Sequence, residues 1–158
     1  GLFPEMIDGG VNVMLGTDGV AADILSSARL MGSVFRDARK DQELFPPGLM
    51  LELATVNGAR GMGMTDTLGS LEVGKKADFV LHDTDLPEWG PVFDAPAQLA
   101  LSAPPAGVHS VWINGVQVLD DGRSTQLDEA KLLADARQAG QALIARTGLP
   151  NRTQWPVS

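Results

Sequence analysis

Asp18 is the residue of this sequence whose type and position most favour chemistry. It lies in Gly16-Thr17-Asp18-Gly19, directly after the apolar run Val11–Leu15. α/β folds place their active sites on loops that follow the C-terminal ends of buried strands, so a carboxylate here is well placed to transfer a proton. An Asp before a helix can also be a simple capping or turn residue. Position alone leaves both interpretations open.

The elements around Asp18 have the pattern of a β/α unit. The β-branched, apolar run Val11–Leu15 is bounded by glycines and predicts a short buried strand. From Ala22 to Arg39 apolar residues recur at three- and four-residue steps, which predicts a helix with one buried face. After Pro46-Pro47, a second helix is predicted over about residues 48–60.

The second half of the chain has the pattern of short strands, and a boundary is predicted between residues 65 and 69. Residues 78–82 predict a strand, and residues 110–119 predict a hairpin around Asn114-Gly115, because a type I′ turn needs two positive φ angles. Residues 89–105 predict a loop with a short helix. A final helix over residues 128–146 is predicted, with Asp128 as its N-cap, one apolar side and Gly148 as its stop.

The charge and composition exclude several classes of partner. The 158 residues carry a formal net charge of -8 with no basic cluster, which argues against a nucleic-acid partner. No apolar stretch is long enough to cross a membrane and no leader pattern opens the sequence. The absence of cysteine excludes thiolate chemistry and favours the cytoplasm. We therefore expect a cytoplasmic protein with no membrane partner. The first residue is Gly1 rather than Met, which suggests a truncation, a processed product or the later part of a longer chain.

Four motifs, in order along the chain, resemble the C-terminal part of the amidohydrolase superfamily, specifically its chlorohydrolase and aminohydrolase branch. The motifs are Gly9-Gly10-Val11 through Gly16-Thr17-Asp18-Gly19, then Ala54–Arg60, then Gly69–Val80, and finally Val111–Gly115 with Asp121-Gly122-Arg123. Each is common by itself, but all four in this order form a specific signal.

The resemblance implies a role for Asp18. In this family a (β/α)8 barrel carries a divalent metal at its C-terminal mouth, and the Asp after the eighth strand is a metal ligand and proton shuttle. The metal lowers the pKa of its bound water, and an adjacent carboxylate can take the proton as hydroxide attacks a C–N carbon. By resemblance, Asp18 is the catalytic residue and the metal ligand of this chain, with zinc the expected metal and iron an alternative.

The remaining family ligands are histidines, a His-X-His pair and two single residues, and this sequence has none of them. Its two histidines are His82, inside a predicted strand, and His109, before the hairpin, where a packed or surface role is the usual one. The sequence also departs from the branch after Gly19, where a Ser or Asn commonly follows. Asp23, four residues on, could touch substrate or interact with the N-terminus of the following helix.

The resemblance further implies the domain organisation. It is an α/β chain in which residues 1–64 are the last β/α unit of a metal-dependent (β/α)8 barrel, 65–126 are part of a β-sandwich, and 127–158 are a C-terminal helix and tail. It places Asn57-Gly58 and Lys75-Lys76 in structural roles.

Two functions remain open from the sequence. The first is the C-terminal portion of a hydrolase that acts on C–N or C–Cl bonds of a small N-heterocycle, in particular an aminohydrolase or deaminase. The second is a non-catalytic module, inactive alone, because one carboxylate cannot hold a catalytic metal and one β/α unit cannot close a barrel. Strands without partners leave open edges, so we expect a homo-oligomer or association with an N-terminal companion.

Overall fold

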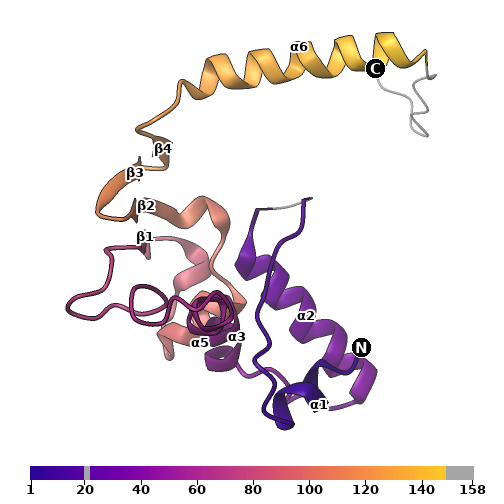
Figure 1. Cartoon of the computed structure of the whole chain (residues 1–158), viewed down its shortest axis with the longest axis vertical. Helices are drawn as coiled ribbons and strands as arrows, with labels where there is room; N and C mark the ends of the chain where they lie inside the picture. Colours follow the sequence, from indigo (N-terminus) through magenta and orange to yellow (C-terminus); the bar gives the residue numbers. More distant parts are fainter. Residues whose placement is uncertain (20–21, 149–158) are drawn as a thin grey trace.

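The computed structural model describes residues 1–19 and 22–148, which form two groups of elements and one outlying helix (Figure 1). The α-helices are α1 (Phe3–Asp8), α2 (Ile24–Arg39), α3 (Pro47–Ala54), α4 (Val56–Gly61), α5 (Ala95–Leu101) and α6 (Glu129–Thr147). The strands are β1 (Phe79–His82), β2 (Val108–Ile113), β3 (Val116–Asp120) and β4 (Arg123–Ser124), and the 3-10 turns are η1 (Pro87–Trp89) and η2 (Pro105–Gly107).

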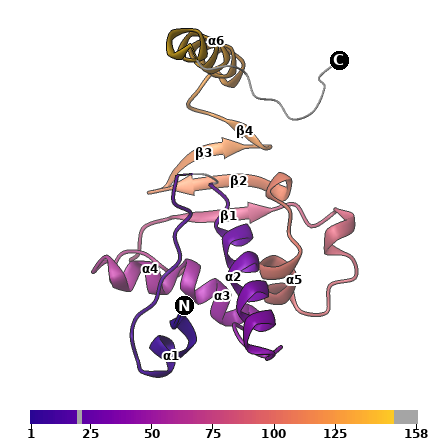
Figure 2. The same cartoon turned by 90° about the vertical axis from the view of Figure 1, so that its right-hand side faces the viewer.

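Helices α2, α3 and α5 enclose the hydrophobic core and lie against one side of the sheet (Figure 2). Met50 and Leu53 of α3 are fully buried there. Helix α2 can approach α3 closely because Gly32 has no side chain: a Cβ at this position would lie 2.2 Å from Cε of Met50. The predicted helix over residues 22–39 is thus confirmed, with its expected buried face formed around Ala28 and Gly32.

The second predicted helix is in fact two helices. α3 and α4 meet at Thr55, whose φ of -129° and ψ of -88° are not helical. The Thr55 hydroxyl donates a hydrogen bond to the Leu51 carbonyl at 2.6 Å, and such a local bond from a β-branched residue competes with the helical pattern. The prediction of one continuous helix over residues 48–60 was therefore wrong.

The predicted buried strand at Val11–Leu15 is not part of a sheet, which corrects the sequence interpretation. From residue 12 onward its side chains alternate as in a strand, since Val13 and Leu15 pack against the core while Asn12 and Met14 are exposed. A buried barrel strand needs a neighbouring strand on each side, and the described residues supply neither. We call residues 11–17 the extended segment.

The sheet is an antiparallel meander in the order β1-β2-β3-β4, as expected for the second half. Phe79 of β1 lies opposite Trp112 of β2, and their rings stack with centroids 4.6 Å apart. Asn114 and Gly115 have φ angles of 51° and 78°, which confirms the predicted turn of the hairpin. The side chain of Asp78 fixes this turn by accepting a hydrogen bond from the Asn114 amide at 2.5 Å.

Helix α6 forms where the sequence predicts it, but it buries none of its residues. Asp128 caps its N-terminus by accepting from the Lys131 amide at 3.0 Å, and Gly148 ends it with a φ of 62°. Both views show it apart from the helices and beyond β4 (Figures 1 and 2). The rest of the predicted C-terminal tail, residues 149–158, lies outside the described residues.

The chain is thus a mixed α/β protein, as predicted. The barrel unit, the sandwich and the boundaries at residues 64 and 126 remain predictions. No helix in the described part of the chain combines the length and apolar character of a membrane span.

Candidate functional site

Asp18 lies on a turn at the end of the extended segment, where the sequence places it. Its φ is 55°, a left-handed conformation that short polar residues such as Asp adopt more readily than most. The Thr17 hydroxyl lies 3.4 Å from the carbonyl oxygen of Asp18. The side chain is exposed, and within the described residues its carboxylate has no hydrogen bond or ion pair. A ligand could therefore reach this carboxylate freely.

Asp23, the other carboxylate near this turn, is fully engaged. It caps α2 by accepting hydrogen bonds from the amides of Leu25 at 3.0 Å and Ser26 at 3.1 Å, and from the Ser26 hydroxyl. Arg29 forms an ion pair with it at 3.5 Å. Burial by itself raises the pKa of Asp23, but these hydrogen bonds and the Arg29 charge outweigh it and leave the pKa below its ordinary value. Of the two roles open for Asp23, the structure shows the contact with the helix N-terminus.

The two histidines lie in the sheet region, His82 on β1 and His109 on β2. His82 packs beside Trp89 with ring centroids 6.1 Å apart, and burial lowers its pKa, which favours the neutral ring. His109 contacts the hydroxyl of Ser110 at 2.8 Å through Nδ1. Across residues 1–19 and 22–148, no three His, Cys, Asp or Glu side chains are grouped so that they could hold a metal ion. A catalytic zinc takes about three protein ligands, so these residues alone do not fit a complete metal centre.

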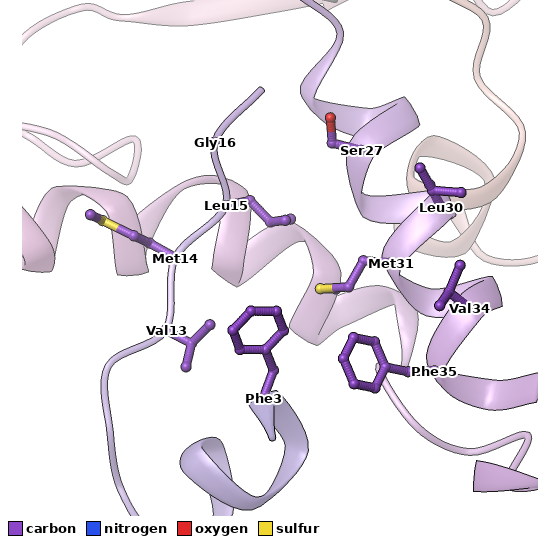
Figure 3. A pocket seen from close by; sticks show the side chains of 10 residues that line it. All are labelled: Phe3, Val13, Met14, Leu15, Gly16, Ser27, Leu30, Met31, Val34 and Phe35. Carbon is purple, nitrogen blue, oxygen red and sulfur yellow. The ribbon is translucent and has the colours of Figure 1, made fainter. Parts of the chain in front are cut away.

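An apolar groove of about 440 Å³ runs between the extended segment, α1 and α2 (Figure 3). The side chains of Phe3, Phe35 and Met31 converge in it, with Val13 beside them. It is also lined by Met14, Leu15, Gly16, Ser27, Leu30 and Val34. Among these described residues the Ser27 hydroxyl is the one polar side-chain group, so the groove is suited to contact apolar surface rather than to carry out chemistry.

A second cavity, of about 660 Å³, lies between the helices and β1 and includes Thr55, Ser70, Asp78 and His82 in its walls. Asp78 there is bonded to the Asn114 amide, as described above. Lys75, near this wall, forms an ion pair with Glu72 at 2.9 Å and contacts Ser70 at 2.6 Å. Ser70, Glu72 and Lys75 thus bond to one another within one turn, which is the kind of contact a structural role of Lys75 would need.

Comparison with known proteins links this arrangement to one family. The model of the amidohydrolase family matches residues 2–118. A 5′-deoxyadenosine deaminase of Methanosarcina acetivorans is 37% identical over 146 residues, covering 90% of this chain and 33% of that protein. An S-triazine hydrolase of Gordonia rubripertincta is 33% identical over 160 residues, covering 96% of this chain and 34% of that protein. The chain thus spans about a third of the length of the relatives it matches.

Comparison with solved structures gives the same result as the comparison of sequences. An adenosine deaminase of Xanthomonas campestris with bound zinc superposes with a TM-score of 0.83 at 33% identity, over 89% of this chain and 33% of that one. An atrazine chlorohydrolase of Arthrobacter aurescens, complexed with zinc, gives a TM-score of 0.77 at 24% identity, over 86% of this chain and 31% of that one. The second likeness bears on the fold alone.

Proposed function

This chain belongs to the amidohydrolase family, and from that membership we propose that it is the C-terminal part of a metal-dependent hydrolase of N-heterocycles, most specifically an aminohydrolase or deaminase. The observation that carries the proposal is the free carboxylate of Asp18, exposed on a turn at the end of the extended segment. The names of the relatives support the substrate class, because they include deaminases of adenine nucleosides and a triazine hydrolase.

Asp18 is the residue that we assign to the metal and to proton transfer. The zinc bound in the similar adenosine deaminase structure supports zinc as the metal, with iron as the alternative. A carboxylate can accept a proton from a nucleophilic water and return it to a departing amine, which a neutral Asn could not do. The contrast with Asp23 supports this choice, since Asp23 is held by the α2 N-terminus and Arg29. The other ligands must come from residues outside the described ones.

The alternative function is a non-catalytic module. One observation favours it for the isolated chain: within the described residues, Asp18 belongs to no cluster of three or more metal-binding side chains. A module of this kind would bind a companion through the open edges of the extended segment and through the apolar groove beside it. We expect such a chain to self-associate or to bind an N-terminal companion, and a strictly monomeric chain in analytical ultracentrifugation would contradict this expectation.

Two properties distinguish the two functions: zinc content by elemental analysis, and release of ammonia from adenosine derivatives and aminotriazines. In the purified chain, tightly bound stoichiometric zinc with turnover would contradict the module. In a longer protein that contains this sequence and supplies the remaining ligands, the hydrolase predicts both zinc and turnover, and Asp18→Asn should abolish the turnover. Asp66→Asn is the matched control, because Asp66 is also exposed but lies outside the segment. In a longer protein that contains this sequence, activity that survives Asp18→Asn would refute the role of Asp18.

A further inference from the structure

The extended segment reaches Asp18 without the support of a sheet, so other contacts must fix its position. The Leu15 amide donates to the Leu53 carbonyl of α3 at 3.0 Å. The Val11 amide donates to the Met6 carbonyl at 2.9 Å, but this bond lies within the preceding turn and does not join the segment to α3 or α4. The Leu15 bond alone cannot define both the direction and the register of seven residues. The side chains that add to it come from α4.

Asn57 of α4 makes the central contact. Its side-chain amide nitrogen Nδ2 donates to the carbonyl of Val13 at 3.0 Å, a partly buried bond between residues 44 apart in the sequence. In return, Nδ2 of Asn12 donates to the Asn57 backbone carbonyl at 3.1 Å. The two bonds join neighbouring residues of the segment to one residue of the helix, so they constrain the segment in both position and direction.

Arg60, one helical turn later, completes the contact. Its guanidinium nitrogen Nη1 donates to Oδ1 of Asn57 at 3.2 Å and to Oδ1 of Asn12 at 3.3 Å. Both amide oxygens are therefore occupied, which orients the amide nitrogens toward the carbonyls they bond. We call Asn12, Asn57 and Arg60, with their bonds to the two carbonyls, the amide clamp.

Gly61 lies directly beside the segment. A Cβ at Gly61 would lie 2.6 Å from Sδ of Met14 and 3.4 Å from Nδ2 of Asn12. The Met14 side chain is flexible and 51% exposed, so it can move aside, whereas the Asn12 amide is held by the clamp. The glycine therefore leaves room for the Asn12 side chain next to the amide clamp.

The register of the segment decides where the Asp18 carboxylate lies. A shift by one residue along an extended chain moves each side chain by about 3.3 Å and turns it to the opposite face. Metal–ligand distances tolerate only about 0.2 Å. Val13 lies five residues before Asp18. A bond that holds the Val13 carbonyl therefore limits the positions that the Asp18 carboxylate can occupy.

We propose that Asn57 is a positioning residue, whose side-chain amide sets the register of residues 11–17 and thereby the place of the Asp18 carboxylate. The importance of this position for catalysis rests on the function proposed for Asp18. The effect of Asn57 on the register of the segment does not depend on that function. Asn suits the position because it both donates to Val13 and accepts from Arg60, whereas an ionised Asp can only accept. Asn is also a poor helix former, so its place inside α4 is explained by these contacts.

Asn57→Asp tests the proposal in the 158-residue chain, because it keeps the shape and the oxygen that faces Arg60 but replaces the Nδ2 donor by an acceptor that cannot bond the Val13 carbonyl. It also adds a negative charge, so the control below adds the same charge elsewhere. We expect amide hydrogen exchange, followed by NMR, to become about tenfold faster at Leu15, whose amide depends on the position of the segment. The amide signals of Asp18 and Gly19 should shift, while the exchange rates of the β2–β3 hairpin stay unchanged. Gln138→Glu on exposed α6 is the matched control and should change none of these signals.

Three results would overturn the proposal. Unchanged exchange at Leu15 would show that the bond does not hold the segment, and unchanged signals at Asp18 would show that it does not place the carboxylate. A uniform acceleration at every amide would show that Asn57 only stabilises the fold. If the Asn57→Asp variant fails to fold, Arg60→Gln is measured in the same way, and the proposal fails unless it shows the local effect. Zinc binding is not used, so a failure of the proposed function does not affect this result.

Discussion

Helices α2 and α6 have the same local design and opposite surroundings. Each begins at an Asp whose carboxylate accepts backbone hydrogen bonds, and each ends at a residue with positive φ, Lys40 after α2 and Gly148 after α6. Helix α2 buries Ala28 and Gly32 against the core, whereas α6 buries none of its residues. Capping and helix propensity therefore determine that a helix forms, and complementary side chains on other elements determine whether it packs.

The comparison predicts where substitutions will change the stability of the whole chain. Residues of α2 and its neighbours should affect global unfolding, because their contacts exist only in the folded core. Residues of α6 should affect the helix alone. The four predictions below follow from this difference, in order of decreasing effect.

Met50→Ala should have the largest effect, because Met50 is fully buried beside Gly32 of α2. We expect the free energy of unfolding to fall by about 2–5 kcal/mol, from lost burial and the cavity left behind. Urea unfolding followed by circular dichroism measures this loss. Met62→Ala is the control, since Met62 is 61% exposed, and an equal loss in both variants would show that the core is not where we place it.

Asp23→Ala removes the cap of α2 and should lower the free energy of unfolding by about 1 kcal/mol. The pKa of Asp23 lies below its ordinary value, so its contribution is present at neutral pH and disappears as the pH falls below about 4. Asp128→Ala removes the corresponding cap of α6. It should reduce helical circular dichroism without moving the unfolding transition of the core, and an equal shift of that transition would mean that α6 packs on the body.

His82 should make a smaller, pH-dependent contribution to the stability of the packed body. Burial lowers the pKa of His82 in the folded chain. As the pH falls, the unfolded chain therefore takes up a proton at a higher pH than the folded chain does. The contribution is complete above the ordinary pKa of about 6.5 and is lost as the pH falls below it. In urea unfolding between pH 7 and 5, His82→Phe should flatten the pH dependence, and an unchanged slope would exclude His82 as its source.

Paired Leu132→Lys and Leu143→Lys substitutions in α6 should have the smallest effect on folding. Both side chains are about half exposed, at 53% and 51%, so we expect a change within about 0.5 kcal/mol. The same variant, compared with the parent chain by analytical ultracentrifugation, shows whether α6 contributes to self-association. A large loss of stability in a monomeric sample would contradict the exposed position of α6.

Local features of this fold could be predicted from sequence, and non-local ones could not. The Asp128 cap and the Asn114-Gly115 turn depend on neighbouring residues, and the structure confirms them. For Asp23 the sequence left two roles open, and the structure shows the cap. The lack of a sheet at Val11–Leu15 depends on partners that the described residues do not include, so an apolar, β-branched run could not reveal it. The break at Thr55 depends on a single hydroxyl bond, which a helical period does not encode.

The candidate site also has a local feature that the sequence could indicate and a non-local one that it could not. The Gly-Thr-Asp-Gly motif, together with the motifs after it, led to the prediction of Asp18, whose metal and proton-transfer roles remain a proposal. The contact between Asn57 and Val13 could not be predicted, because it joins residues distant in sequence. An Asn inside a predicted helix was the one local signal of it, since a poor helix former in such a place often has a tertiary partner.

The amide clamp also has a consequence for the order of events during synthesis. Val13 leaves the ribosome 44 residues before Asn57, and the Leu53 carbonyl that holds Leu15 also follows later. The nascent chain therefore carries Asp18 for some time with neither support in existence. A product terminated before α3 would contain the whole Gly-Thr-Asp-Gly motif and still have neither of these supports for its carboxylate.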